Sequence, residues 1–419
     1  MNRFAYSLLW HLGLPLIGLR LLWRARRQPE YLQHLGERFG AAPLPGERPR
    51  IWLHAVSVGE TRAAQPLIKA LLAAWPEHDI LLTHMTPTGR ATSEELFGKE
   101  ARVTRCYLPY DFPWAQARFL ARAKPALGIV METEVWPNLM QAARQAGLPM
   151  LLVNARLSAR SARGYARLGT LARQTYGAFR EVLAQTGDDA ARLRDTGADP
   201  VSVCGNLKFD VELAPDRLAL GERFRAAAAG RPVILAASTR EGEEGPLLDA
   251  FMRHAPADAL LVVVPRHPQR FDEVATLIAQ RGLGSERRSD GIRIAPQTRV
   301  WLGDSMGEMV AWYRMADLAL IGGSWAPLGG QNLIEACAVG TPVLVGPHTF
   351  NFTEAAEKAI AAGAASRCTD IDEGLRVAVT LLGDDARRRR MGEAGQHFAA
   401  ANRGATAKTM AVIGAVLGG

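Results

Sequence analysis

IWLHAVSVGETRAAQPLIKALLAAWPEHDILLTH, residues 51–84, decides the fold class of this chain. The stretch begins with an apolar run, Ile51–Val56, and ends with a second, Asp79–His84. Leucines recur at helical spacing between the two runs, which predicts a helix over Thr61–Trp75. The runs are apolar throughout rather than alternating, as expected for strands of a parallel sheet covered on both faces. The stretch therefore predicts a βαβ unit.

Apolar runs of the same kind recur in two series, separated by a pause at Gly205–Asp216. The pause lacks strong periodicity and is typical of an interdomain connection. Two series of strands and helices predict an α/β protein with two doubly wound, Rossmann-like domains that face each other across a cleft. Ligands of such domains lie at the carboxyl ends of the strands. The further predicted strands are Leu127–Glu132, Pro149–Asn154, Glu181–Thr186, Pro232–Ser238, Leu260–Pro265, Val300–Gly303, Leu318–Gly323 and Pro342–Gly346.

Composition excludes several classes of protein. The chain has 419 residues and a mass of 45.5 kDa, which suits two domains. Apolar residues make up 48% and charged residues 22%, a globular composition that excludes disorder, collagen and coiled coil. The four cysteines form no CxxC pair, so neither a disulfide framework nor a cysteine zinc site is expected. A net charge of +8 favours an anionic partner: nucleic acid, anionic lipid or a phosphorylated substrate.

The N-terminal stretch Phe4–Leu19 carries no formal charge and is followed by arginines between Arg20 and Arg27. It is shorter than the roughly 20 residues that span a bilayer, yet Trp10 and Trp23 suit a lipid–water interface. Arginines stand where a signal peptide would have its cleavage site. We predict a membrane anchor, spanning or lying in the interface, with the rest on the cytoplasmic side; a core helix is the alternative. The predicted division is an anchor and connecting segment at 1–40, a first domain at 41–208, a second at 209–400 and a closing helix at 401–419.

Motifs of several common enzyme classes are absent. No G-x-G-x-x-G follows a strand and no G-x-x-x-x-G-K-[ST] occurs, which disfavours dinucleotide oxidoreductases and excludes P-loop kinases. H-E-x-x-H is missing as well, so no zincin site is expected. Asp370 and Asp372 resemble a metal-binding pair, but helix capping explains them better, and we predict no metal site.

Three ionisable residues of the first domain are candidates for chemistry. Glu60 lies in a glycine turn after the first strand, where it is either a general base for a hydroxyl or an acid that complements a helix N-terminus. Glu132 and Glu134 end a later strand; alternatively, one of them caps the helix that begins near Pro137. Lys208 lies in the interdomain connection, where it either meets an anionic donor or is a solvated lysine.

The second domain has features of a nucleotide site. Arg266, His267 and Arg270 directly follow the strand Leu260–Pro265. Because arginine binds phosphate in a bidentate way, a nucleotide phosphate is the natural ligand of this loop.

Two glycine-containing loops strengthen that interpretation. Gly303–Glu308 precedes a helix, although Ser305 and Glu308 also fit a capping box. The segments Gly322–Ser324 and Gly329–Glu335 form a glycine-rich loop that runs into a helix, and the glutamate at its end can accept from ribose hydroxyls. Motifs after three successive strands of one domain favour a nucleotide-binding site.

A series of motifs in this order resembles the Kdo transferase family (3-deoxy-D-manno-octulosonic acid transferase, lipid A-specific). The resemblance runs from the N-terminal anchor to the last helices, and only the C-terminal tail has no motif. The motifs are His54–Thr61, Met85–Gly89, Tyr107–Asp111, Met131–Asn138, Asn154–Arg160, Pro265–Pro268, Gly303–Glu308 and Gly346–Phe352.

The resemblance implies an inverting glycosyltransferase of the GT-B fold, with an anchor in the inner membrane and its catalytic body in the cytoplasm. Such enzymes move Kdo from CMP-Kdo to a hydroxyl of the lipid A precursor lipid IVA in lipopolysaccharide core synthesis, and need neither a metal nor another cofactor. The family's catalytic base falls on Glu60, and residues that assist the transition state fall on Glu132 and Lys208. CMP contacts fall on Pro265, Arg266, Met306, Gly307, Glu308, Asn332, Leu333, Ile334 and Glu335.

Two other kinds of function stay open at this point. One is another GT-B nucleotide-sugar enzyme, a UDP-sugar transferase or an epimerase, which leaves the first-domain motifs unexplained. The other is a catalytically inert, membrane-tethered nucleotide-sugar-binding protein, against which the presence of Glu60, Glu132 and Lys208 argues. No basic patch with interleaved aromatic residues is present, so we expect anionic lipid and phosphorylated substrates, and no nucleic acid, as partners.

Overall fold

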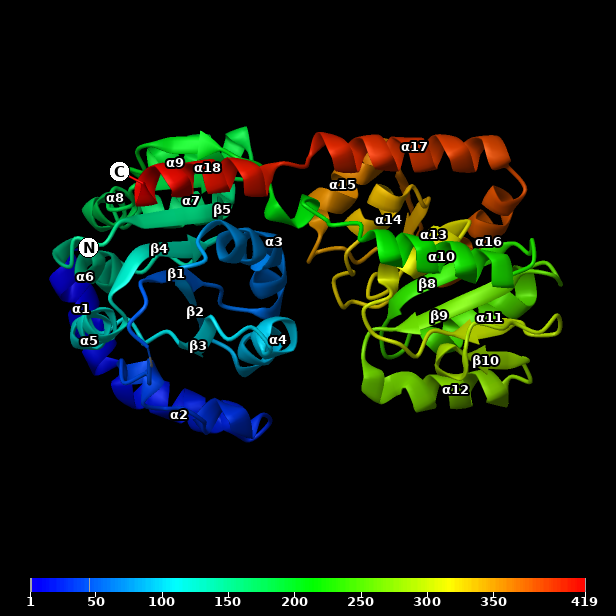
Figure 1. Cartoon of the computed structure of the whole chain (residues 1–419), viewed down its shortest axis with the longest axis horizontal. Helices are drawn as coiled ribbons and strands as arrows, with labels where there is room; N and C mark the ends of the chain where they lie inside the picture. The colour runs from blue at the N-terminus through cyan, green and yellow to red at the C-terminus, as the bar shows by residue number, and fades with distance from the viewer. Residues whose placement is uncertain (1, 45, 419) are drawn as a thin grey trace. The chain divides into compact units, whose positions relative to one another are not determined.

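The computed structural model describes residues 2–44 and 46–418, and divides the chain into two compact units (Figure 1). The first unit runs to Asp210 and includes the C-terminal segment from Arg403 onward. The second unit is Val211–Asn402. Each unit contains a seven-stranded sheet in which all neighbouring strands are parallel.

The sheet of the first unit has the strand order β3-β2-β1-β4-β5-β6-β7. The strand numbers run in opposite directions on the two sides of the β1/β4 pair. In open α/β sheets such a switch point leaves a crevice at the carboxyl ends of the two strands, where ligands bind. The strands are β1 (Arg50–His54), β2 (Asp79–His84), β3 (Val103–Tyr107), β4 (Pro125–Met131), β5 (Met150–Ala155), β6 (Glu181–Ala184) and β7 (Val201–Val203).

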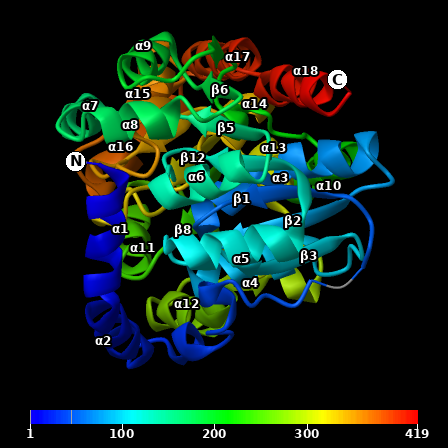
Figure 2. The same ribbon diagram turned by 90° about the vertical axis from the view of Figure 1, so that its left-hand side faces the viewer.

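Helices cover both faces of this sheet, and alternate residues of β1 serve the two cores. Leu53 packs toward α3 (Val58–Ala74) and α18 (Ala405–Leu417), whereas Trp52 packs on the other face against Phe119, with ring centroids 5.3 Å apart. Figure 2 shows α5 and α6 over the strands. The remaining helices are α4 (Pro87–Phe97), α5 (Pro113–Ala123), α6 (Pro137–Gln145), α7 (Ala159–Ala166), α8 (Thr170–Tyr176) and α9 (Gly187–Asp195).

The second sheet has the order β10-β11-β9-β8-β12-β13-β14, with its change of direction between β8 and β12. Apolar residues from both faces are buried, and Phe224, Trp301 and Trp312 form a ring cluster with centroids 4.5–5.0 Å apart. Its strands are β8 (Val233–Thr239), β9 (Leu260–Pro265), β10 (Ser285–Arg287), β11 (Val300–Leu302), β12 (Leu318–Ile321), β13 (Val343–Val345) and β14 (Ala365–Arg367). Its helices are α10 (Pro215–Ala227), α11 (Glu244–His254), α12 (Phe271–Gln280), α13 (Met309–Met315), α14 (Ile334–Val339), α15 (Thr353–Ala361), α16 (Ile371–Leu382) and α17 (Asp385–Ala401).

The predicted strands are all present, but four strands were not predicted: β3, β7, β10 and β14. These four are the outermost strands of the two sheets. An edge strand has a neighbour on one side only and is partly exposed, so its sequence lacks the continuous apolar run of a central strand.

The N-terminal stretch forms two helices, α1 (Arg3–Leu12) and α2 (Leu14–Ala25), bent by 52°. Of the helices in residues 2–44 and 46–418, no single one is long and apolar enough to cross a bilayer, although this bent pair together meets that length and composition. Trp10 packs on Phe112 and Trp136 of the first unit, at centroid distances of 5.5 and 6.4 Å. Trp10 is thus half-buried against the first unit, whereas Trp23 is exposed.

The end of the predicted connecting segment belongs to the core of the first unit. Glu37 and Arg38 are buried, and the Arg38 guanidinium lies 3.9 Å from the ring centroid of Tyr107. The Glu37 carboxylate accepts from the Tyr107 N–H at 2.8 Å and pairs with Arg90 at 2.6 Å. The segment thus fixes the N-terminal helices to the carboxyl ends of β2 and β3.

Candidate active site

Glu60 lies at the carboxyl end of β1, on one side of the crevice in the first sheet. Because α3 begins at Val58, Glu60 is in its first turn, and the carboxylate accepts from the backbone N–H of Val56. Burial, followed by the charges of Glu132 and Glu134, raises the pKa of Glu60 to about 7. A helix N-terminus alone would lower it. A carboxyl that titrates near neutral pH is suited to general base catalysis.

Glu132 lies on the other side of the crevice, directly after β4. Glu132 is 4% exposed and has a positive φ of 55°. This backbone conformation costs a non-glycine residue about 1–3 kcal/mol and is found mostly at functional sites. One carboxylate oxygen, Oε2, lies 2.8 Å from Nε of Arg156. The other, Oε1, lies 3.7 Å from Nζ of Lys208. The structure therefore brings two cations to one buried carboxylate.

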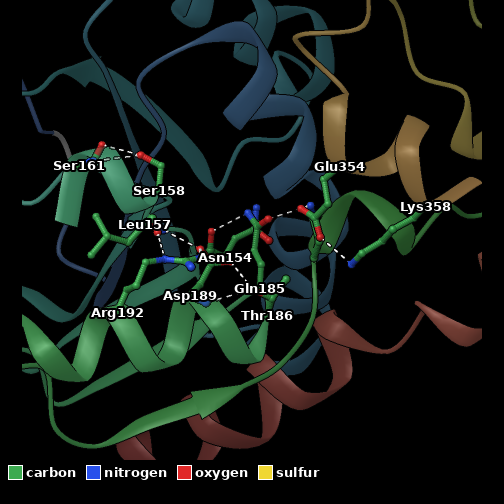
Figure 3. A network of polar contacts seen from close by, with 11 residues as sticks. Asn154, Leu157, Ser158, Ser161, Gln185, Thr186, Asp189, Arg192, Glu354 and Lys358 are labelled. Carbon is green, nitrogen blue, oxygen red and sulfur yellow. Dashed lines mark hydrogen bonds and ion pairs between the residues drawn. The ribbon is translucent and has the colours of Figure 1, made fainter. Parts of the chain in front are cut away.

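Lys208 is fixed to the first unit by the residues beside it, so it is not a solvated linker lysine. The Leu207 N–H donates to Oδ1 of Asn154 at 3.0 Å, and the Lys208 N–H donates to Oδ1 of Asn206 at 3.0 Å. Asn206 in turn donates to Gln185, whose amide donates to the Asn154 carbonyl (Figure 3). Asn154 is buried and, like Glu132, has a φ of 55°.

The segment that carries Arg156 is held in the same region. The buried Asp189 carboxylate accepts from the Leu157 N–H at 2.9 Å and from Arg192 at 3.0 Å, and Arg192 also donates to the Leu157 carbonyl (Figure 3). The backbone next to Arg156 is therefore anchored, although 60% of the Arg156 side chain is exposed. Arg156 was not predicted as a site residue.

The alternative that Glu132 or Glu134 caps the helix near Pro137 is wrong. Asp111, in the loop after β3, accepts from the N–H groups of Asn138 and Leu139 at 3.0 and 2.8 Å. Glu134 instead accepts from the indole N–H of Trp136 at 2.9 Å. Because the capping residue comes from the loop after another strand, no local sequence pattern predicts it. Neither Glu132 nor Glu134 is therefore needed as a cap of this helix.

The crevice of the second unit, between β8 and β12, is organised by the buried carboxylate of Glu243. One oxygen accepts from the N–H groups of Arg240 and Gly323, both at 2.8 Å. The other accepts from those of Trp325 and Ala326 at 3.0 and 3.3 Å. Glu243, which follows β8, therefore fixes the start of the glycine-rich loop that follows β12. Its role was not predicted from the sequence.

Basic residues gather at the carboxyl ends of β8 and β9. Pro265 ends β9, Arg266 follows it half-buried, and partial burial followed by the charges of Arg240, Arg266 and Arg270 lowers the pKa of His267. Arg270 is committed elsewhere, since it pairs with the buried Glu244 and with Glu273. Arg270 is thus held by two carboxylates, whereas Arg266 directly follows β9 and Arg240 directly follows β8 at the same edge of the sheet.

In the loop Gly303–Glu308, the predicted capping box is wrong because α13 begins only at Met309. Both oxygens of Glu308 pair with Arg288, at 3.1 and 3.0 Å, and Ser305 donates to Glu308 at 2.6 Å. The loop also has G-x-S-x-G spacing, but this hydroxyl is committed to Glu308 rather than to a histidine base. Met306 is exposed, and Gly307 has a φ of 75°.

The last predicted group lies after β12. Asn332 accepts from the Ile334 N–H at 3.0 Å and donates to Oε1 of Glu335 at 3.2 Å. Leu333 and Ile334, which the family resemblance places at the nucleotide, are both buried, at 1% and 0% exposed. Elsewhere in the unit, Asp370 caps α16 by accepting from the Glu373 N–H at 2.8 Å, which confirms the capping prediction. In the part of the chain that the structure describes, no group of three histidine, cysteine or acidic residues is suited to hold a metal ion.

Solved structures show the class of fold. The chain is similar in structure to a glycosyltransferase from Rickettsia africae, with a TM-score of 0.55 and 15% identity over 89% of this chain and 99% of that one. HepE of Anabaena in complex with UDP is similarly related, with a TM-score of 0.55 and 14% identity over 88% and 99%. The chain therefore has the GT-B fold, as predicted.

Sequence comparison identifies the family. Residues 33–211 match the family described as 3-deoxy-D-manno-octulosonic-acid transferase (kdotransferase). Transferases of that name from Bordetella pertussis and Haemophilus influenzae are 49% and 36% identical, over 98% and 97% of this chain and 98% and 96% of theirs. The chain belongs to the 3-deoxy-D-manno-octulosonic acid transferase family, glycosyltransferases of lipopolysaccharide biosynthesis. The resemblance found in the sequence is confirmed.

Proposed function

We propose that this protein transfers Kdo from CMP-Kdo to a hydroxyl of lipid IVA, with inversion and with Glu60 as the general base. The observation that carries the proposal is the half-buried Glu60 carboxyl, whose pKa is raised to about 7 beside the buried Glu132. At neutral pH a large share of Glu60 is ionised and able to take a proton, and its basicity exceeds that of an ordinary glutamate.

The proposed reaction is a single displacement at the anomeric carbon of Kdo. Glu60 takes the proton of the acceptor hydroxyl while the oxygen of that hydroxyl bonds to the anomeric carbon. At the same time the bond between the anomeric carbon and the phosphate oxygen of CMP breaks, and its electron pair stays on CMP. Attack opposite the leaving phosphate inverts the configuration. The anomeric carbon gains positive character as CMP leaves, and Glu132 and Lys208 assist this transition state. No metal or other cofactor takes part, since the positive charge that the phosphate requires comes from Arg266 and Arg240.

The donor contacts of the proposal are those implied by the family resemblance. Arg266 binds the CMP phosphate, and Arg240 adds a second guanidinium from the adjacent strand. Fixed loop geometry around the nucleotide is supplied by Glu243 and by the Arg288–Glu308 pair. The remaining contacts are Pro265, Met306, Gly307, Glu308, Asn332, Leu333, Ile334 and Glu335.

The experiment that tests the function is an assay of the purified protein with CMP-Kdo and lipid IVA, read by mass spectrometry. We expect products heavier than the acceptor by whole Kdo residues. Parallel reactions with a panel of UDP-sugars are the control for donor class. Transfer from a UDP-sugar but not from CMP-Kdo would assign the protein to another donor, and no transfer by folded protein would support an inert binding protein.

We propose further that α1 and α2 attach the protein to the cytoplasmic face of the inner membrane. Nine of their large apolar side chains are exposed, and arginines lie in the second half of α2 and just after it, which suits an anionic lipid surface. The exposed side chains are Phe4, Leu8, Leu9, Leu12, Leu14, Leu16, Leu19, Leu22 and Trp23.

The double variant Leu12→Gln/Leu16→Gln is expected to bind vesicles containing anionic lipid at least ~10-fold more weakly than the wild type. Each buried leucine contributes about 1.5–3 kcal/mol of transfer free energy. Vesicle co-sedimentation measures the affinity. The control is Val203→Gln/Met252→Gln, which replaces two exposed apolar residues outside these helices. Equal binding of both double variants would remove α1 and α2 from this role.

A further inference from the structure

We propose that Arg156 is a positioning residue for the transfer reaction, because its guanidinium holds the Glu132 carboxylate in place and compensates its charge beside the Glu60 base. The inference rests on the proposed role of Glu60 as that base. It assigns Arg156 no contact with either substrate, so Arg156 acts on the reaction only through Glu132 and Glu60.

The buried Glu132 has two cationic partners, at different distances. A carboxylate that is 4% exposed is costly unless its charge is compensated. Arg156 Nε lies 2.8 Å from Oε2, a charge-assisted hydrogen bond, whereas Lys208 Nζ lies 3.7 Å from Oε1, outside ordinary hydrogen-bond distance. Arginine stays protonated in proteins, so its compensation does not change over the working pH range. The closer partner of Glu132 is thus the one whose charge is constant.

The backbone on both sides of the Arg156–Glu132 ion pair is held in place. Surface ion pairs contribute little because both long side chains must be ordered. Here the acceptor is buried and held by the positive φ of Glu132, and the chain next to Arg156 is anchored through Leu157, Asp189 and Arg192. The conformational entropy lost on forming the pair therefore comes mainly from the Arg156 side chain. This favours a single, defined geometry of the ion pair.

Several ionisable groups surround the Arg156–Glu132 ion pair. Glu60, Glu132 and Glu134 supply three carboxyls, against the cations Arg156 and Lys208. His54, at the end of β1 and 6.3 Å from the Trp136 ring, is buried, and burial lowers its pKa to about 3, so it is neutral. Loss of the Glu132 charge therefore favours ionised Glu60. Loss of the Arg156 cation leaves the negative charge of Glu132, still beside Lys208, less compensated, and this disfavours ionised Glu60.

The test is the pH dependence of kcat/KM for the full chain with CMP-Kdo and lipid IVA, in the wild type, Glu132→Gln, Arg156→Gln and Arg156→Lys. We expect the acid limb of Glu132→Gln to move to lower pH and that of Arg156→Gln to higher pH, each by about one pH unit. Arg156→Gln lowers kcat and leaves KM for CMP-Kdo within about twofold, and Arg156→Lys restores most of the activity and the position of the limb.

The matched control is Arg160→Gln, which removes an exposed arginine of the adjacent helix α7. An Arg156→Gln acid limb that coincides with that of Arg160→Gln would overturn the inference. So would a large rise in KM with an unmoved limb, because Arg156 would then bind substrate. Glu60→Gln separates the two proposals: if it keeps both activity and acid limb, the proposed base is wrong, whereas if it is inactive and the Arg156→Gln limb is unmoved, only this inference fails.

Discussion

Replacement of Glu60 by glutamine is expected to lower turnover by at least ~10²-fold while leaving the fold intact. Glutamine has the same shape and can still accept from the Val56 N–H, but it cannot take a proton from the acceptor hydroxyl. The measurement is kcat with CMP-Kdo and lipid IVA, with mass spectrometry of the product. The matched control is Glu134→Gln, which removes a carboxyl from the same loop cluster and is expected to keep activity within about tenfold. Near-normal turnover by folded Glu60→Gln would exclude this residue as the base.

The same variant has a second expected result, on stability. The pKa of Glu60 is raised from 4.5 to about 7 in the folded protein, mainly by burial, so the folded state holds this proton more tightly than the unfolded state. The contribution of Glu60 to stability is therefore full below pH 4.5 and is lost as the pH rises through about 7. Glu60→Gln should melt at a higher temperature than the wild type at pH 8, with the difference shrinking toward pH 5. A difference that grows on acidification would contradict the raised pKa.

Replacement of Glu243 by glutamine is expected to destabilise the second unit by about 3 kcal/mol and to lower its melting temperature by roughly 10 °C. Both oxygens of the Glu243 carboxylate accept from two backbone N–H groups each. A glutamine NH₂ in place of either oxygen would point donors at donors, leaving two buried N–H groups unsatisfied.

The measurement for Glu243→Gln is thermal unfolding with and without CMP, because the glycine-rich loop that Glu243 holds is part of the proposed nucleotide site. We expect the stabilisation by CMP to shrink along with the melting temperature. Glu241→Gln removes an exposed acid two positions away and is the control. A Glu243→Gln protein with wild-type stability would show that the loop does not depend on these hydrogen bonds.

The two crevices differ in how far the sequence predicts them. Glu60 and Glu132 each follow an apolar run, so their place at the carboxyl ends of strands was predictable from local pattern. The contacts of Glu132 were not, because Arg156 and Lys208 come from other strand loops. For the same reason Asp111 and Glu243 gave no signal, since each accepts from backbone N–H groups distant in the chain.

The sequence by itself determined the central strands, the class of fold and the chemical groups after each strand. These features depend on residues within a few positions of one another, through periodic burial and local capping such as that by Asp370. Only the tertiary structure decided which strands are neighbours, and hence that the loops after β1 and β4, and those after β8 and β12, share a crevice. It also decided the edge strands and the partners of each buried carboxylate. Strand order and ion pairing depend on contacts between distant segments, for which the chain carries no local pattern.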